Sequence, residues 1–299
     1  MSKSNWNTQN IPDQKGKVVI ITGATSGLGK EAARVLAEKN ARVIMAVRNI
    51  GKGEDVASEL IKEFINSEIS VRDLDLVSLA SIKSFTDGIL KDYDRLDILI
   101  NNAGIMMSPY SKTKDGFEIQ MGTNHLGHFA LTGYLMPLLN KTKGSRIVAT
   151  SSVGHRFGNI DFTDFNWENR KYNPSRAYGD SKLANLYFTY ELARKLGTGT
   201  DAPKVTAAHP GWTRTELQRH AGGLRYLNNF FSQGPDMGVL PTLRAAIDPE
   251  AEPGDYFGPS WFFEMHGYPV KVKSNERSHD KEAARQLWDL SEKMTGVSF

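Results

Sequence analysis

Short runs of apolar and β-branched residues alternate along this chain with longer stretches that have helical spacing. Residues 17–21 (Lys-Val-Val-Ile-Ile) are too few for a helix and typical of a buried parallel strand, whereas residues 30–38 combine helical spacing with helix-forming residues. The same pattern predicts further strands over residues 41–47, 69–72, 97–100, 145–150 and 204–208. It predicts helices over residues 52–65, 78–92, 117–139, 175–196 and 279–295.

This alternation predicts the fold class. Strands that are connected through helices pair in parallel, and the helices cover both faces of the resulting sheet. A short seventh strand is expected near Tyr256 and Phe257. We therefore predict an α/β fold of the Rossmann type, with a doubly wound parallel sheet of about seven strands and helices on both faces.

We expect residues 1–299 to form a single domain, because no linker rich in Pro, Ser or Gly interrupts the alternation. Residues 1–16 are a polar leader. Two longer stretches, residues 153–174 and 212–235, break the rhythm just after predicted strands. Ligands bind at the carboxyl edge of an open α/β sheet, so both stretches are expected to line a substrate site.

Composition and charge exclude several classes of protein. The 299 residues include no cysteine, which excludes disulfides, thiol nucleophiles and Cys-ligated metals. The formal net charge of +3, from 37 Lys and Arg against 34 Asp and Glu, is too small to indicate nucleic-acid binding. The N-terminus is polar, and no apolar run approaches the roughly 20 residues of a membrane helix. We expect a cytoplasmic protein without a membrane anchor.

A glycine-rich segment, Thr22-Gly23-Ala24-Thr25-Ser26-Gly27-Leu28-Gly29, joins the first predicted strand to the first predicted helix. Glycines let the backbone turn sharply and approach a pyrophosphate, which then rests on the helix N-terminus. The spacing is G-x3-G-x-G rather than the general G-x-G-x-x-G. In its strand–turn–helix context the segment predicts nucleotide binding, and the alternative is a tight turn without a ligand.

The end of the second predicted strand indicates which dinucleotide binds. An NAD site places an acidic residue there, roughly 20 residues after the glycines. This chain has Val47, Arg48 and Asn49 instead, with no acid before Glu54. A cation at this point suits a 2′-phosphate, so NADP(H) is favoured over NAD(H). The alternative is that Arg48 is a solvated surface residue.

Tyr178 and Lys182 lie four residues apart on a predicted helix and therefore share one face of it. A free tyrosine has a pKa near 10 and is a poor base at neutral pH. An ammonium group one turn away favours tyrosinate, which would make Tyr178 a general acid and base for a carbonyl or alcohol oxygen. Taken alone the pair could be an ordinary surface pair, but with the glycine-rich segment it indicates a catalytic site.

With these motifs the chain resembles the short-chain dehydrogenase/reductase family from residue 17 to about residue 215. It is most similar to the retinol-dehydrogenase-like branch of that family. The segments that carry this closer resemblance are Asn124-His125-Leu126-Gly127-His128-Phe129, Ser181-Lys182-Leu183-Ala184-Asn185 and His209-Pro210-Gly211.

The resemblance implies roles in holding the cofactor. Asn102 to Gly104 would border the adenosine ribose, Asp75 and Leu76 the adenine, and the segment from Pro210 to Thr215 the nicotinamide amide. Thr213 stands where the family has Val or Ile, so its backbone is expected to matter. The full predicted cofactor-binding set is Gly23, Thr25, Ser26, Gly27, Leu28, Gly29, Arg48, Asn49, Asp75, Leu76, Asn102, Ala103, Gly104, Tyr178, Lys182, Pro210, Gly211, Trp212, Thr213 and Thr215.

The resemblance also implies the chemistry, which is NADPH-dependent reduction of an aldehyde or ketone, or the reverse. Tyr178 would donate a proton to the carbonyl oxygen, and Ser152, with Ser151 as a close rival, would hydrogen-bond the same oxygen. Lys182 would lower the pKa of Tyr178 and bind the nicotinamide ribose, and Asn124 would hold a water beside Lys182. No metal is needed.

Other readings stay open. One is a dinucleotide-binding regulator without turnover, although such proteins usually lose the Tyr or Lys. The second is another chemistry on the same fold, such as epimerisation or enoyl reduction, whose motifs differ. The family often dimerises through helices that here would be residues 117–139 and 175–196, so a homodimer is an option.

Departures from the family pattern concern the substrate. The stretch between Ser152 and Tyr178 is longer than in most members, as in the retinol-dehydrogenase-like branch. Microsomal retinol enzymes carry an N-terminal membrane anchor, and the polar start of this chain favours a relative acting on other small-molecule aldehydes or ketones.

Several weaker signals each have more than one interpretation. His125 and His128 could share a metal, but the absence of an H-E-x-x-H motif favours a structural role. His209 is expected to be a packed strand-end residue. An aromatic group could line the substrate pocket or pack elsewhere, and it comprises Trp212, Tyr226, Phe230 and Phe231. A second group could line the pocket or a subunit contact, and it comprises Trp261, Phe262, Phe263 and Met265.

Overall fold

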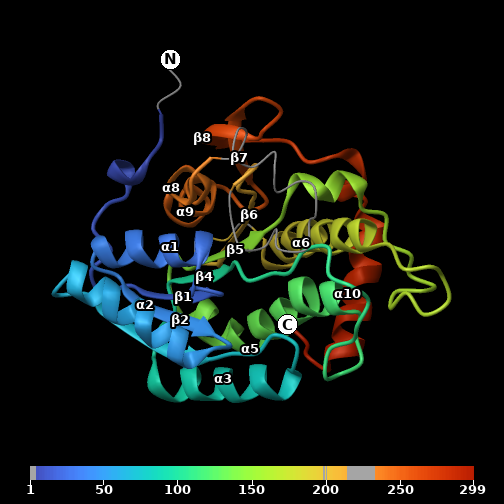
Figure 1. Cartoon of the computed structure of the whole chain (residues 1–299), viewed down its shortest axis with the longest axis horizontal. Coiled ribbons are helices and arrows are strands. Elements are labelled where there is room, and N and C mark those ends of the chain that lie inside the picture. Colours follow the sequence, from blue (N-terminus) through green and yellow to red (C-terminus); the bar gives the residue numbers. More distant parts are fainter. Residues whose placement is uncertain (1–4, 198, 200, 214–232) are drawn as a thin grey trace.

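One eight-stranded sheet organises the chain in a computed structural model that describes residues 5–197, 199, 201–213 and 233–299 (Figure 1). The strand order is β3-β2-β1-β4-β5-β6-β7-β8, and every neighbouring pair is parallel except β7 and β8. The strands are β1 (Val18–Thr22), β2 (Arg42–Val47), β3 (Glu68–Asp73), β4 (Ile98–Asn101), β5 (Arg146–Thr150), β6 (Lys204–Ala208), β7 (Tyr256–Trp261) and β8 (His266–Lys271).

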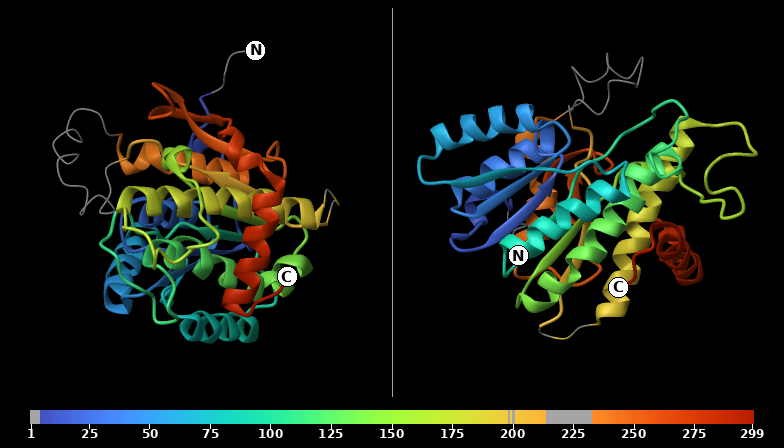
Figure 2. Two further views of the ribbon diagram at one scale, coloured as in Figure 1. Left: turned by 90° about the vertical axis from the view of Figure 1, so that its right-hand side faces the viewer. Right: turned by 90° about the horizontal axis from the view of Figure 1, so that it is seen from below.

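Helices cover both faces of this sheet, as the sequence pattern predicts (Figures 1 and 2). One face carries α1 (Gly27–Glu38), α2 (Ile50–Glu63), α8 (Pro235–Gly238) and α9 (Leu240–Ile247). The other carries α3 (Leu79–Asp92), α5 (Gly127–Lys141) and α6 (Pro174–Leu196). The remaining helical segments are η1 (Thr8–Asn10), α4 (Ile119–Met121), the π-helical turn η2 (Gly122–Leu126), η3 (Val153–Phe157), η5 (Glu276–His279) and α10 (Lys281–Thr295).

The central strand β1 shows why its sequence is apolar throughout. Val19 and Ile21 belong to the core under α1, whereas Val18 and Ile20 belong to the core under α3 and α5. A strand that is buried on both faces cannot alternate polar and apolar residues. The continuous run of valine and isoleucine is therefore the expected signature of a central parallel strand.

The strand order reverses between β1 and β4, and the carboxyl ends of the strands beside such a reversal are where ligands bind in open α/β sheets. β1 pairs with β2 on one side and β4 on the other, and the chain then continues outward through β5 and β6. Segments that follow four of these strands consequently meet at one edge. They are the glycine-rich turn, the segment after Asn101, the segment after Thr150 and the segment after Ala208.

The prediction of about seven strands is corrected to eight. β7 lies where a seventh strand is expected, but β8 was not foreseen and pairs with β7 in antiparallel fashion. Its sequence explains the omission, because Gly267 and Pro269 are both unfavourable in strands. Pro269 is tolerated because β8 is the edge strand of the sheet.

The helix expected over residues 117–139 is also interrupted. The chain forms α4, then one π-helical turn, then α5, which continues to Lys141 through Pro137. In the π turn the Gly127 amide donates to the Gly122 carbonyl, five residues back. The polar leader is anchored as well, since Trp6 and Ile11 are buried in the core beside α1.

The C-terminal helix α10 crosses α6 and packs over the π turn (Figure 2). An aromatic cluster closes this layer: Trp288 of α10 lies 4.7 Å from Phe299 and 5.1 Å from Phe129 of α5, between ring centroids. The homodimer that the resemblance allows would use the helices of the predicted stretches 117–139 and 175–196, and it stays a prediction. Of the helices that the structure describes, none is both long and apolar enough to span a membrane.

We expect Trp288→Ala to lower the free energy of unfolding by about 3–5 kcal/mol, because the substitution opens a cavity in a packed aromatic cluster. Chemical denaturation monitored by circular dichroism measures this loss. Trp261→Ala is the matched control, since that ring is 68% exposed, and we expect little change. Equal losses in the two variants would contradict the packing described for α10.

Candidate functional site

The glycine-rich turn is tightly packed at Gly23 and Gly29, where an added Cβ would lie less than 3 Å from neighbouring atoms. A Cβ on Gly29 would lie 2.4 Å from the Gly23 carbonyl oxygen and 2.6 Å from the Asn102 side-chain nitrogen. Gly23 and Gly27 adopt φ angles of +70° and +53°, which side chains disfavour. The Asn102 amide also donates to the Thr22 carbonyl at 2.8 Å, which ties the turn to the end of β4.

These residues fit a dinucleotide. The turn ends at Ser26, the N-cap of α1, whose side chain makes no capping hydrogen bond to the helix, and the first turn of α1 contains no acidic residue. The amide groups and the positive end of the helix dipole are thus left to an anion such as a pyrophosphate. Thr25, Ser26 and Gly27 are half-buried, while Leu28 is buried against the core.

At the end of β2 the structure exposes Arg48 and uses Asn49 as the N-cap of α2. The Asn49 side chain accepts a hydrogen bond from the Lys52 amide at 2.9 Å. Arg48 makes no hydrogen bond or ion pair within the described residues, and the first turn of α2 has no acid. A cation beside a helix N-terminus without acids forms a positively charged surface.

The predicted adenine-side residues lie at the next strand end. Asp75 is half-buried and pairs with Lys114 at 3.0 Å, and Leu76 is buried. Leu76 packs against the first residue of α5, where a Cβ on Gly127 would lie 2.6 Å from the Leu76 carbonyl oxygen. Both residues therefore follow β3 on the same edge as the glycine-rich turn.

Helix α6 buries the Tyr178 and Lys182 side chains together. Lys182 Nζ lies 5.7 Å from the centre of the Tyr178 ring and donates to the Thr150 carbonyl at 3.1 Å. Burial lowers the pKa of Lys182 to about 8 and raises the pKa of Tyr178, because each charged form loses water. Burial thus opposes the lowering of the Tyr178 pKa that the sequence spacing predicts.

The two serines after β5 take different positions. The Ser151 hydroxyl is buried and donates to the Lys182 backbone carbonyl at 2.9 Å. Ser152 is half-buried, and its side chain close to the Tyr178 phenol works to lower the phenol pKa, against the larger effect of burial. Ser152 also accepts from the Gly154 amide at 3.1 Å. Of the two serines, Ser152 is the one placed beside the Tyr178 phenol.

Asn124 lies in the π turn and joins three segments. Its side-chain oxygen accepts from the Ile105 amide at 2.8 Å, and its nitrogen donates to the Ile105 carbonyl at 3.0 Å and to the Ser181 hydroxyl at 2.9 Å. A Cβ on Gly104 would lie 3.1 Å from Asn124 Oδ1 and 3.5 Å from Lys182 Nζ. The segment after β4 therefore comes close to both side chains.

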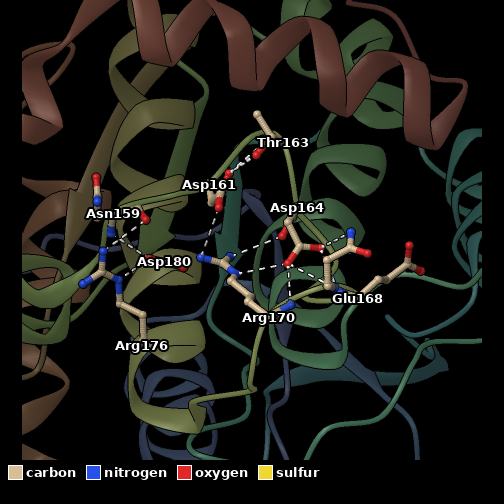
Figure 3. A network of polar contacts seen from close by, with 9 residues as sticks. Asn159, Asp161, Thr163, Asp164, Glu168, Arg170, Arg176 and Asp180 are labelled. Atoms are coloured by element: carbon tan, nitrogen blue, oxygen red, sulfur yellow. Dashed lines mark hydrogen bonds and ion pairs between the residues drawn. The ribbon is translucent and has the colours of Figure 1, made fainter.

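Ion pairs and hydrogen bonds of charged side chains hold the predicted substrate stretch, residues 153–174, in place (Figure 3). Arg170 stacks 3.6 Å over the Trp167 ring centre and pairs with Asp164 at 3.5 Å and Asp161 at 3.7 Å. Asp164 in turn accepts from the Glu168 amide at 2.8 Å.

A second group of polar contacts joins this stretch to α6 near Tyr178. The Asn159 amide donates to the buried Asp180 carboxylate at 2.6 Å, and Arg176 pairs with Asp180 at 3.4 Å. Burial raises the pKa of Asp180, and the Asn159 amide counteracts that rise. The stretch is thus fixed to the helix that carries the Tyr–Lys pair.

After β6 the chain turns at Pro210 and Gly211, and Gly211 has φ +65°. The Thr213 hydroxyl donates to the Pro210 carbonyl at 2.7 Å, and Trp212 donates its amide to Met265 at 3.0 Å. Thr215, like Tyr226, Phe230, Phe231 and most of the predicted stretch 212–235, lies outside the described residues.

Sequence reasoning missed Glu264, at the turn between β7 and β8. Its carboxylate pairs with Arg156 at 2.9 Å and with His209 Nε2 at 3.1 Å. Phe262, Phe263 and Glu264 all have positive φ angles, a conformation that costs a non-glycine residue about 1–2 kcal/mol. No sequence signal marks this turn, which fastens the C-terminal hairpin to the segments after β5 and β6.

The structure also shows the surroundings of the histidines and aromatic residues that gave weaker sequence signals. The His209 ring is fully buried, as expected for a packed strand-end residue. His125 bonds the Ser291 hydroxyl of α10, and His128 bonds Thr22, so the two rings have different partners. Among the residues that the structure describes, no three His, Asp or Glu side chains are grouped as a metal site requires. Trp261, Phe262 and Phe263 are exposed.

The site thus combines a glycine-rich turn that fits a dinucleotide with a buried Tyr–Lys pair at one edge of a doubly wound sheet, an arrangement typical of an NAD(P)-dependent oxidoreductase. The chain matches the model of the short chain dehydrogenase family over residues 17–222. It belongs to the short-chain dehydrogenase family and to its retinol-dehydrogenase-like branch.

Curated relatives and solved structures are similar over most of the chain. Human retinol dehydrogenase 12 is 43% identical over 290 residues, which cover 95% of this chain and 88% of the relative. Human retinol dehydrogenase 13 is 41% identical over 294 residues, covering 94% and 85%.

Two solved structures are informative. An uncharacterized protein from Mycobacterium paratuberculosis superposes with a TM-score of 0.84 at 41% identity, covering 99% of both chains. A short chain dehydrogenase from Shigella flexneri, complexed with NADP, has a TM-score of 0.66 at 27% identity, covering 82% of this chain and 97% of its own.

We expect Gly29→Ala to weaken NADPH binding and to destabilise the protein by about 1–3 kcal/mol, because the added methyl must displace backbone and the Asn102 side chain. Fluorescence titration with NADPH and thermal melting measure the two effects. Gly88→Ala in α3 is the control, since nothing lies within 4 Å of its Cβ, and it should bind NADPH normally. Normal binding by Gly29→Ala would contradict the close packing of the turn.

Proposed function

We propose that this protein is an NADPH-dependent oxidoreductase that reduces aldehydes or ketones to alcohols, or runs the reverse reaction. The observation that carries the proposal is the placement of the Tyr178 phenol. It is buried, close to the Ser152 side chain and adjacent to the Lys182 ammonium, at the strand edge where the glycine-rich turn lies. Family membership supports hydride-transfer chemistry at this site.

We assign each residue its role in the reaction from these contacts. NADPH, when bound at the glycine-rich turn, would supply the hydride for the carbonyl carbon. Tyr178 donates its phenol proton to the carbonyl oxygen, and the Ser152 hydroxyl hydrogen-bonds the same oxygen as negative charge develops. The nearby Lys182 ammonium stabilises the tyrosinate that remains. Asn124 would hold a water molecule beside Lys182, through which a proton returns to Tyr178.

NADP(H) is the cofactor that the end of β2 favours. Arg48 is exposed and unpaired within the described residues, and the neighbouring start of α2 has no acid. A 2′-phosphate would find a cation and a helix N-terminus there, whereas the ribose hydroxyls of NAD would find no carboxylate. The NADP complex of the Shigella relative is consistent with this choice.

The substrate is a small molecule that the stretch 153–174 helps to enclose. The curated relatives are retinol dehydrogenases, so retinal belongs in a substrate panel beside aliphatic, aromatic and steroid carbonyls. NADPH binding without turnover of any compound would favour the alternative, a dinucleotide-binding regulator. The predicted cytoplasmic location and homodimer stay predictions.

Tyr178→Phe tests the acid. We expect kcat/KM to fall by about 10²- to 10⁴-fold, because the variant keeps the ring but has no proton to donate. The assay is NADPH oxidation with the best carbonyl of the panel. Tyr134→Phe on α5, whose ring lies half-buried under Lys83, is the matched control and should keep full activity. Undiminished turnover in Tyr178→Phe would overturn the proposed mechanism.

Arg48→Ala tests the cofactor preference. We expect the KM for NADPH to rise by about 10- to 100-fold, the range of one lost charge-assisted hydrogen bond, with little change for NADH. The control is Arg42→Ala at the opposite end of the same strand, where Arg42 forms only a surface ion pair with Glu68. An unchanged NADPH/NADH ratio in Arg48→Ala would exclude this residue from 2′-phosphate recognition.

A further inference from the structure

His128, on the first turn of α5, is a buried polar group that the proposed reaction does not use. Its ring is 4% exposed and lies between two segments of the site. Nδ1 lies 3.1 Å from the Asn124 carbonyl oxygen in the π turn, and Nε2 lies 2.9 Å from the Thr22 hydroxyl at the end of β1. The ring therefore spans from the Asn124 turn to the residue that precedes the glycine-rich turn.

The first of these contacts fixes one proton of the ring. A carbonyl oxygen only accepts hydrogen bonds, so Nδ1 carries a hydrogen that it donates to Asn124. Burial and the nearby Lys182 ammonium lower the pKa of His128 to about 4, although the Asn124 carbonyl opposes this change. The ring is therefore neutral at pH 7, and Nε2 is an acceptor.

The hydrogen bonds of Thr22 agree with this assignment. Its hydroxyl oxygen accepts from the Asn102 and Ala103 amides, each at 2.9 Å, which uses both lone pairs. Its single hydrogen must therefore be donated, and the His128 Nε2 at 2.9 Å is closer than the Ile100 carbonyl at 3.4 Å. Every donor and acceptor of the His128 ring and the Thr22 hydroxyl is then satisfied.

We propose that His128 is a positioning residue, which in its neutral Nδ1–H form links the Thr22 hydroxyl to the Asn124 carbonyl and so sets the π turn relative to the cofactor-binding turn. The inference rests on the proposed function, since Asn124 and Lys182 belong to the catalytic set. Through Thr22, the link also reaches the amides of Asn102 and Ala103. One imidazole thus connects the ends of β1 and β4 to the helix that bears Asn124.

His125 supplies a matched comparison. It lies three residues earlier, is equally buried, and has a pKa lowered to about 3 by burial. Its Nε2, however, bonds the Ser291 hydroxyl of α10 at 2.8 Å, away from the cofactor-binding turn. A change at His125 tests the effect of losing a buried imidazole without breaking the link from Thr22 to Asn124.

Two substitutions separate the two ends of the link. His128→Asn places an amide nitrogen near the position of Nδ1 and keeps a donor for the Asn124 carbonyl. His128→Gln reaches the position of Nε2 and keeps a partner for Thr22, but leaves the Asn124 carbonyl without its donor. We expect kcat of His128→Gln to fall about tenfold with a shifted pH profile, the effect of one lost hydrogen bond, and the KM for NADPH to stay within about twofold.

His128→Asn should lower kcat about tenfold as well, because it keeps the donor to Asn124 but no longer reaches Thr22, so the link is broken at its other end. His125→Gln, whose amide keeps a partner for the Ser291 hydroxyl, should leave the pH profile unchanged. The inference is overturned if either His128 variant retains full kcat with an unchanged pH profile, or if His125→Gln shifts the profile as far as they do.

A measurement without turnover keeps the test independent of the proposed function. In the unmodified protein labelled with ¹⁵N-histidine, we expect at pH 7 one buried imidazole with hydrogen on Nδ1 and a bare Nε2 whose signal changes in Thr22→Val. A protonated His128 Nε2 overturns the link. If instead the tautomer is as expected and Tyr178→Phe keeps full activity, the link stands and the proposed function fails.

Discussion

A buried ammonium group is the constraint on which the rest of the site depends. Lys182 is 3% exposed, and burial brings its pKa down to about 8. Removing such an ion from water costs several kcal/mol unless nearby groups accept its hydrogens. The Thr150 carbonyl at the end of β5 accepts one of them. The carboxyl end of that strand and the face of α6 must therefore keep a fixed relation.

Glycines satisfy the steric side of this constraint. Gly158 and Gly179 allow the backbone after Ser152 to touch α6, since a Cβ on Gly158 would lie 2.5 Å from the Gly179 carbonyl oxygen. Gly154 faces the Tyr178 ring, where a Cβ would lie 3.1 Å from the ring edge. These contacts hold Ser152 beside the phenol. The polar side chains of the site are thus positioned by close contacts at glycines, which contribute no side chain of their own.

The sequence pattern predicted the parallel part of the sheet and the face shared by Tyr178 and Lys182, because periodicity and i, i+4 spacing are local properties. It did not predict β8, because Gly267 and Pro269 are unfavourable in strands. They are tolerated because β8 is an edge strand that pairs with β7 alone. Nor did the pattern predict the π turn, because the extra residue per turn follows from tertiary packing. Whether a buried phenol gains or loses acidity likewise depends on surroundings that spacing does not reveal.

The family model ends at residue 222, and the chain beyond it supports the site from two directions. At one side, Glu264 of the β7–β8 turn holds Arg156 and His209, which follow β5 and β6. At the other, Ser291 of α10 bonds His125 inside the π turn that carries Asn124. Both supports act on backbone segments next to the proposed catalytic residues rather than on those residues themselves. Changes in the C-terminal region can therefore alter the geometry of the site while every motif of the family is retained.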